Sequence, residues 1–307
     1  SLIKQQADWP DIVDSVTTLQ DSWTNQWLSC LNSAPSALQK HLSQEKSHFI
    51  GAYFESLWAF YLLSNPRYEL LAKNLQANSN KRTEGEFDFI IWDNEKSVCI
   101  HQEIAIKFYL GFDQENYHKF TDGKNIWLGP QCKDRLDLKM DKMLNSQINL
   151  STKNSGKQAL KSVNIDTDTT RIETQLVMKG YLFYPKNPTV VSPSFCNQNH
   201  LKGLWFTLDE FAAYIEESNF NAWAMLTKAE WVSPYSADIS AFNISTDRKN
   251  NESCFTERPD IIRAVKDKVT IENRPWMIAC LIRRDNVYFE KVRLFAVPDS
   301  WPQIDTL

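Results

Sequence analysis

The chain has 307 residues, of which 42% are hydrophobic and 12% aromatic, and its formal net charge is -4. This length and composition allow a large buried core and argue against disorder. The slightly negative charge excludes a protein that attracts nucleic acid over its whole surface, so any such contact must come from a local patch.

Motifs and cysteine spacing exclude several further classes. Only eight residues are glycine, and no GxGxxG or GxxxxGK motif occurs, so a Rossmann or P-loop nucleotide site is not expected. The six cysteines contain no CxxC pair, which leaves a structural zinc site unsupported and predicts reduced thiols. Without a long apolar run or a signal-peptide pattern, we expect no membrane span and a cytoplasmic protein.

The first part of the chain is predicted to be helical. Apolar residues recur at intervals of three and four between residues 11 and 31, and a short helix follows from Ser36 to about Leu42. Residues 47–65 contain FIGAYFESLWAFYLL, which is apolar on nearly every side and indicates a buried helix. Its one charge, Glu55, must therefore be paired or belong to a site.

Three strands are predicted next. Residues 68–78 alternate loosely in polarity and lead into RTEGEFDFIIWDNEKSVCIHQEIAIKFYL, which covers residues 82–110. Its apolar parts, 86–92 and 98–110, flank the polar segment DNEKS. This pattern predicts an antiparallel hairpin.

The hairpin carries acids and a lysine on otherwise apolar strands. Alternation places Glu86 and Asp88 on one face of the first strand, and Glu103, Ala105 and Lys107 on one face of the second. The apolar residues between them indicate a sheet that is covered on both sides. Buried charges are costly unless they are paired or bind a metal, and carboxylates are preferred ligands of Mg²⁺ and Mn²⁺.

A loop that is suited to cover a site is predicted at residues 111–124 and 127–130, followed by a helix at residues 133–147. One face of this helix is apolar but includes Gln147, which either joins a structural network or faces the acidic strands. An adjacent stripe is basic and suited to nucleic-acid contact, although a charge run is more often a solvated face. Its members are Arg135, Lys139 and Lys142.

The remaining predictions alternate loops with regular elements. We expect a mobile loop or an insertion at residues 151–170, a strand at 174–184 and a loop at 238–259. The capping box TLDE at Thr207 predicts a helix to about Ser218. Two apolar runs near the C-terminus, at residues 276–282 and 287–297, predict a second hairpin.

The order helix, three strands, helix, strand resembles the core of the PD-(D/E)XK nuclease superfamily. That core holds an Asp on its second strand and an acid-x-lysine on its third, within a mixed sheet flanked by helices. A closer similarity is to an uncharacterised bacterial family catalogued as domain of unknown function 1853. It rests on GAYFESLWAFYLL, GEFDFIIWD, HQEIAIKFYLG, WLGPQCKDRLDLK and KGYLFYP, from about Phe49 to beyond Trp205.

The resemblance implies a mixed α/β (α+β) fold with a restriction-endonuclease-like core and N-terminal helical and C-terminal hairpin elaborations. We expect a single domain over residues 1–307, with the core at 47–185 and the C-terminal elaboration at 186–307 packed on it. The implied site consists of the metal ligands Asp88 and Glu103, with Glu86 adding a ligand or holding a lysine, and of Lys107, Glu55 and Gln147 in catalytic roles.

The implied function is a nuclease that uses Mg²⁺ or Mn²⁺ to hydrolyse phosphodiester bonds in DNA or RNA. A metal activates water and neutralises charge on the phosphate, and a lysine stabilises that charge. The superfamily places the lysine two residues after the acid, but Ala105 stands there, and Lys107 lies about 6 to 7 Å farther along the strand. The alternative is a catalytically inactive nuclease-fold module that binds nucleic acid or a protein partner.

Three further readings of these residues remain open. Asp88, Glu103 and Lys107 would form a structural ion-pair network in the inactive module, although buried ion pairs contribute little to stability. A glycosidase would use Glu86 and Glu103 as its carboxylate pair but needs a sugar-sized cleft. His101 shares the face of Glu103 and either assists acid–base chemistry or has a structural role.

Overall fold

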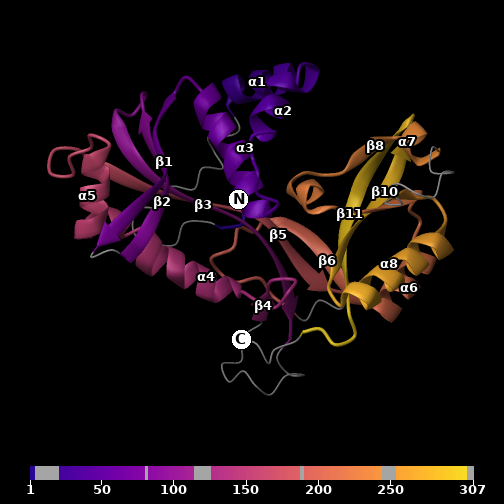
Figure 1. The fold of residues 1–307 in the computed structure, drawn as a ribbon. Helices are drawn as coiled ribbons and strands as arrows, with labels where there is room; N and C mark the ends of the chain where they lie inside the picture. The colour runs from indigo at the N-terminus through magenta and orange to yellow at the C-terminus, as the bar shows by residue number, and fades with distance from the viewer. Residues whose placement is uncertain (4–20, 80–81, 114–125, 187–189, 244–253, 303–307) are drawn as a thin grey trace. The chain divides into compact units, whose positions relative to one another are not determined.

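The computed structural model describes residues 1–3, 21–79, 82–113, 126–186, 190–243 and 254–302 (Figure 1). The chain forms two compact units that are not consecutive in sequence. The first comprises Ser1–Ile106, Asp137–Lys179 and Ser194–Gln198, and the second comprises Lys107–Leu136, Gly180–Pro193 and Asn199–Leu307. Residues 47–185 are therefore divided between the units, and the expectation of a single domain stays a prediction.

The first unit begins with helices and continues into the predicted strands. The helices are α1 (Ser22–Ser33), α2 (Ser36–Leu42) and α3 (Ile50–Ser64), and the strands are β1 (Tyr68–Ser79), β2 (Arg82–Asp93) and β3 (Val98–Phe112). The predicted hairpin is confirmed, because β2 pairs with both β1 and β3 in antiparallel register. The part of the first predicted helix before residue 21 lies outside the described residues.

The turn of the hairpin is held by a buried acid. The Asp93 carboxylate accepts hydrogen bonds from the Arg67 guanidinium at 2.7 and 3.1 Å and from the backbone N–H groups of Glu95 and Lys96. These donors hold the pKa of Asp93 below its usual value, although its burial acts in the opposite direction. Because it is paired and hydrogen-bonded, the Asp93 carboxylate can therefore remain buried beside the turn of the hairpin.

A second group of helices completes the first unit. It consists of α4 (Leu136–Lys142), the π-helix η3 (Met143–Gln147), the 3-10 helix η4 (Leu150–Thr152) and α5 (Asn154–Ser162). The predicted loop at residues 151–170 is therefore wrong up to residue 162, whereas residues 163–170 contain no helix or strand. Although the composition of this segment is polar, Leu150, Ala159 and Leu160 pack into one cluster with Phe87 of β2. This tertiary contact stabilises a helix that propensity alone does not favour.

The second unit contains the last residues of β3 and of β5 (Ile172–Pro185). Its other strands are β4 (Ile126–Leu128), β6 (Leu201–Thr207), β7 (Ala222–Met225), β8 (Ser236–Asp238), β9 (Cys254–Phe255), β10 (Trp276–Arg284) and β11 (Val287–Val297). The predicted strand at residues 174–184 and the C-terminal hairpin are confirmed. Because β6 is parallel to β5 and β11 while β10 and β11 are antiparallel, the sheet is mixed.

Helices α6 (Leu208–Glu217) and α8 (Arg258–Glu272) pack their apolar sides on this sheet, around Phe206, Phe211 and Val265. The capping box predicted at Thr207 is confirmed, since its N–H donates to Glu210 Oε2 at 3.0 Å and its hydroxyl accepts from the Glu210 N–H. The 3-10 helix η5 (Lys228–Val232) lies between β7 and β8.

Two loop predictions in the second unit need correction. The segment 127–130 begins within β4, and 238–259 contains the end of β8, α7 (Ile239–Asn243), β9 and the start of α8. Residues 114–125 and 244–253 lie outside the described residues, so the loops expected there are not tested. The short strands β8 and β9 are decided by pairing with β11 and β7, because their own sequences carry no periodic pattern.

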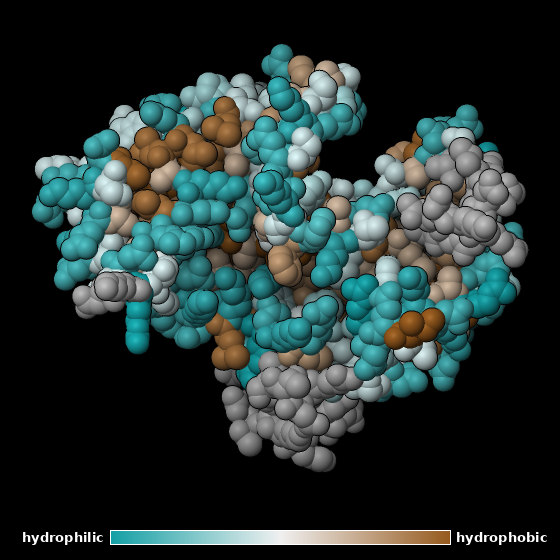
Figure 2. Space-filling view, viewed as in Figure 1, coloured by the Kyte–Doolittle hydropathy of each residue, from teal (hydrophilic) through white to brown (hydrophobic). Residues whose placement is uncertain are grey.

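The fold is thus mixed α/β, with a mixed sheet flanked by helices. All six cysteines are free thiols, as predicted. Hydrophilic residues predominate on the face drawn in Figure 2, and hydrophobic residues form smaller patches there. Within the described ranges, no helix combines the length and apolarity that a membrane crossing requires.

Candidate functional site

The first site residue, Asp88, stands where the backbone ladder between β2 and β3 ends. That ladder runs from the pair Asp93–Val98 to the pair Phe89–Gln102. At the next position of β2, Asp88 Oδ2 accepts a hydrogen bond from the Ile104 N–H at 2.9 Å. A side-chain oxygen thus replaces a backbone acceptor and holds the Asp88 carboxylate close to Glu103, the neighbour of Ile104 in sequence.

The Asp88 carboxylate lies in an unfavourable electrostatic environment. Burial, followed by the negative charge of Glu103, raises the pKa of Asp88 to about 7. The Ile104 N–H and the Lys139 charge oppose this rise, and Glu55 adds to it. The nearby positive charge therefore does not compensate for the two carboxylates on adjacent strands. A cation bound between them would offset both the desolvation cost and the repulsion between their charges.

The second acid, Glu103, is fully buried and held at both oxygens. Its Oε1 lies 2.9 Å from His101 Nε2, and its Oε2 accepts a hydrogen bond from Gln147 Nε2 at 2.6 Å. His101 is also fully buried and packs edge-on against Phe87, with 4.7 Å between ring centroids. Its Nδ1 has no hydrogen-bond partner among the described residues. Glu103 is thus oriented from two elements.

Gln147 resolves one open prediction, because its amide faces the acidic strands. It lies in the π-helix η3, and its Oε1 accepts a hydrogen bond from Lys139 Nζ at 3.1 Å. The contacts form a continuous chain from Lys139 through Gln147 to Glu103 and on to His101. A helix cation and a strand carboxylate are therefore linked through one amide.

Glu55 is half-buried on α3 in the same unit. Burial raises its pKa, while the charge of Lys73 and a hydrogen bond to Asn74 lower it. Glu86 raises it further, although Glu86 itself is exposed on β2. Since Glu55 also raises the pKa of Asp88, the helix acid and the strand acids belong to one electrostatic environment.

Lys107 has a different environment from the acids with which the sequence groups it. It belongs to the second unit, where its Nζ lies 2.6 Å from Asp134 Oδ2. Tyr109 Oη donates to the same oxygen at 3.4 Å. Both partners of the ion pair are partly exposed, at 30% for Lys107 and 37% for Asp134. The described contacts therefore give Lys107 a carboxylate of its own unit as its partner.

The predicted basic stripe is not a single helix face. Helix α4 begins at Leu136, so Arg135 precedes it and instead forms an isolated β-bridge with Leu128 of the second unit. Lys139 and Lys142 do lie on α4, and Lys142 is exposed. Lys139 is connected to the acidic site through its hydrogen bond to Gln147.

Sequence reasoning missed a buried polar network beside this site. Trp58 Nε1 of α3 donates to Gln102 Oε1, and Gln102 Nε2 donates to Gln175 Oε1 of β5 at 2.7 Å. Both glutamines are buried in otherwise apolar strands. An amide side chain within an otherwise apolar strand is recognisable in the sequence, and a buried amide requires hydrogen-bond partners.

The carboxylates of Asp88 and Glu103 are potential ligands of a metal ion. The described part of the chain contains no group of three or more His, Cys, Asp or Glu residues that could hold one. Mg²⁺, however, is commonly bound by one or two carboxylates together with waters and substrate phosphates. Asp88 and Glu103 form such an oxygen pair, and a carboxylate retains lone pairs beyond one hydrogen bond per oxygen. The types of donor present therefore suit Mg²⁺ or Mn²⁺ better than a structural zinc ion.

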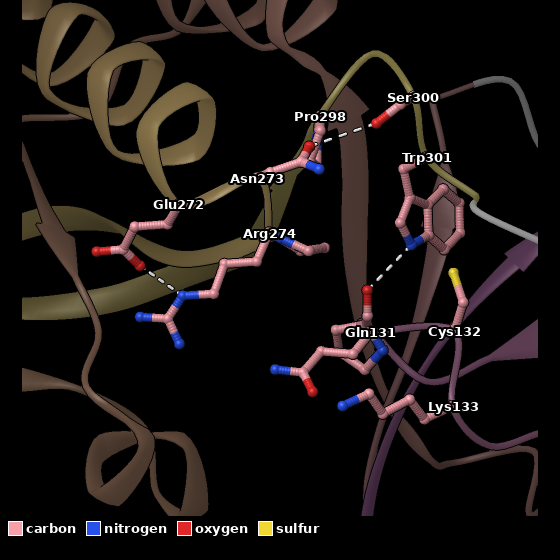
Figure 3. Close-up of a pocket in the computed structure, with 11 residues that line it drawn as sticks. Gln131, Cys132, Lys133, Glu272, Asn273, Arg274, Pro298, Ser300 and Trp301 are labelled. Carbon is pink, nitrogen blue, oxygen red and sulfur yellow. Dashed lines mark hydrogen bonds and ion pairs between the residues drawn. The ribbon is translucent and has the colours of Figure 1, made fainter. Parts of the chain in front are cut away.

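A cavity of about 300 Å³ lies in the second unit and contains none of the predicted site residues (Figure 3). Its lining includes Lys133 and an Arg274 guanidinium that is turned toward Glu272, its ion-pair partner. Trp301 Nε1 donates to the Pro130 carbonyl at 3.0 Å. Because Arg274 is already paired with Glu272, this cavity is weaker evidence of a functional site than the two acids Asp88 and Glu103.

Comparison with known proteins adds a family but no activity. No curated protein and no solved structure matches the chain. A family model described as "Domain of unknown function (DUF1853)" matches residues 1–297. Because this match spans nearly the whole sequence, the chain belongs to the DUF1853 family.

Proposed function

We propose that this protein is a nuclease that depends on Mg²⁺ or Mn²⁺ and hydrolyses phosphodiester bonds in DNA or RNA. The observation that carries the proposal is the placement of Asp88 against the Ile104 N–H, which brings a second carboxylate to Glu103 in a buried setting. Retaining both acids on apolar strands needs a reason other than stability, because their charges repel each other. Cation binding supplies that reason.

The arrangement of elements supports a restriction-endonuclease-like core. Helix α3 precedes three antiparallel strands, the acids lie on β2 and β3, and the following helix presents Gln147 to Glu103. This order and these residue types agree with the pattern of the PD-(D/E)XK superfamily. We therefore place the chain in that superfamily as part of the proposal.

In this function Asp88 and Glu103 hold the metal ion, with Glu55 and the exposed Glu86 at the edge of the site. The bound ion would activate water and neutralise charge on the phosphate. The water oxygen forms a bond to phosphorus, the bond to the leaving oxygen breaks, and a proton from water passes to that oxygen. His101 and Gln147 orient Glu103 through its two oxygens, and the exposed Lys142 is available to nucleic acid.

A specific observation also favours the second candidate, an inactive nuclease-fold module that binds nucleic acid or a protein. Lys107, the lysine of the strand pattern, is neutralised by Asp134. If no other cation assists the phosphate, the site binds a metal without efficient hydrolysis. The two candidates differ in cleavage, so one assay separates them.

The decisive experiment incubates the protein with single- and double-stranded DNA and RNA in the presence of Mg²⁺ or Mn²⁺. Wild type is compared with Asp88→Asn and Glu103→Gln, and the exposed Asp168→Asn serves as a matched acid control. We expect cleavage by wild type and the control, and loss in both site variants. Equal activity in all four proteins would remove the assigned site. Salt-sensitive binding without cleavage would favour the binding module.

A further inference from the structure

We propose that Lys139 of helix α4 supplies the ammonium group at the reacting phosphate, in place of a strand lysine. The inference rests on the proposed nuclease function and names a residue for one of its steps. Two observations support it. Strand β3 offers the acids no positive charge that is not already paired, and Lys139 contacts the site through a helix side chain.

The strand position that should carry the lysine cannot do so. Ala105, two residues after Glu103, is buried and uncharged. The next residue on that face, Lys107, forms a 2.6 Å ion pair with Asp134, which also accepts a hydrogen bond from Tyr109. Moving Lys107 to a phosphate would leave Asp134 without its cation. The strand therefore provides no uncommitted positive charge for the acids.

Lys139 reaches the site through a single side chain. Its Nζ donates to Gln147 Oε1 at 3.1 Å, and the same amide donates to Glu103 Oε2 at 2.6 Å. One ammonium group is thus linked to the proposed metal ligand Glu103 by a single amide, from the helix side of the site.

The π-helix explains how two residues of one helix come into contact. Eight residues separate Lys139 from Gln147, which would leave them about 80° apart around a straight α-helix. From Met143 onward the helix widens, as shown by the hydrogen bond from the Ile148 N–H to the Met143 carbonyl at 3.1 Å. A wider turn advances by a smaller angle per residue and reduces the offset. Burial of Met143 anchors this turn.

The contact suits a lysine that assists chemistry. An ammonium group has three donors, so its bond to Gln147 is compatible with contact to a phosphate oxygen. The bond also restricts a flexible side chain before the substrate arrives, which reduces the entropy lost on binding. As negative charge grows on the phosphate oxygens, a preorganised cation stabilises the transition state more than the ground state.

The test compares single-turnover cleavage by Lys139→Met, Lys139→Arg and Lys107→Met, with the exposed Lys157→Met of α5 as a matched control. We expect Lys139→Met to lose about 100- to 1000-fold in the cleavage rate, the usual range for removing one charge-stabilising donor. Lys139→Arg should retain part of the rate, and Lys107→Met should lose less than Lys139→Met. Thermal unfolding of each variant checks that the fold is kept.

A second measurement needs neither metal nor cleavage. The titration of Asp88 is followed by NMR in metal-free protein with ¹³C-labelled aspartate. In Lys139→Met the pKa of Asp88 should rise above its wild-type value, because a nearby cation is removed, whereas Lys157→Met should leave it unchanged. An unchanged pKa in Lys139→Met would overturn the placement of its charge at the site.

The outcomes separate this inference from the nuclease proposal. A wild type that cleaves, together with full activity in Lys139→Met or a greater loss in Lys107→Met, overturns the role of Lys139 alone. A wild type that cleaves neither DNA nor RNA with either metal overturns the nuclease and, with it, the role of Lys139. Loss of cleavage in Lys139→Met with a raised Asp88 pKa supports both.

Discussion

Replacing Asp88 with asparagine should stabilise the metal-free protein at neutral pH. The substitution removes a carboxylate that is partly buried near Glu103 but keeps an oxygen that can accept from the Ile104 N–H. The hydrogen bond at the end of the β2–β3 ladder is therefore retained. Only the cost of holding a negative charge in this place is lost.

The magnitude follows from the pKa of Asp88, which is about 7 in the folded protein against an ordinary value of 3.8. The folded state thus binds this proton more tightly than the unfolded chain does. The carboxyl imposes no charge penalty below about pH 4, and its contribution to stability is lost as the pH rises through about 7. At about 1.36 kcal/mol for each pKa unit, the loss reaches about 4 kcal/mol, which is an upper estimate for a pair of interacting acids.

The assay is urea unfolding, followed by tryptophan fluorescence, at several pH values between about 4 and 8 with EDTA present. The difference in unfolding free energy between Asp88→Asn and wild type should be near zero at the acidic end and grow to as much as about 4 kcal/mol at the basic end. Asp168→Asn, an exposed acid of the same unit, should show no such growth. A difference that does not change with pH, or one that favours wild type at pH 8, would refute the reasoning.

Three predictions concern the fold itself, each measured by urea unfolding. Arg293→Met should cost about 3 to 5 kcal/mol, because it leaves the buried Glu290 carboxylate without its cation. Gly156→Ala should cost about 1 to 3 kcal/mol, because a Cβ there would clash with the Leu150 carbonyl oxygen. Thr207→Ala should cost about 1 kcal/mol through loss of the capping box of α6.

Matched substitutions distinguish these causes from a general loss of stability. Arg263→Met breaks an exposed ion pair with Asp260 and should change stability by less than about 1 kcal/mol. Gly51→Ala adds a Cβ with no atom within 4 Å, so it should be neutral or slightly stabilising. Thr207→Ser should keep most of the cap. Equal effects within any of these pairs would contradict the corresponding explanation.

The features that sequence determined by itself are those set by neighbouring residues. Paired apolar runs predicted the hairpin of β2 and β3 and that of β10 and β11, and a local pattern predicted the cap at Thr207. The site acids Asp88 and Glu103 were recognisable for a related reason, since a charge on an apolar strand stands out against its neighbours. Such signals need no knowledge of distant contacts.

Tertiary structure decided the features that depend on residues far apart in the chain. Helix α5 has a polar sequence and forms because Leu160 packs into a cluster with Phe87. The pairing of Lys107 with Asp134 spans 27 residues, and that of Gln147 with Glu103 spans 44. Sequence periodicity specifies which face of an element is apolar but not which distant side chain meets it. For this reason Asp88 and Glu103 stood out in the sequence as charges on apolar strands, whereas the link from Lys139 through Gln147 to Glu103 emerged only from the folded chain.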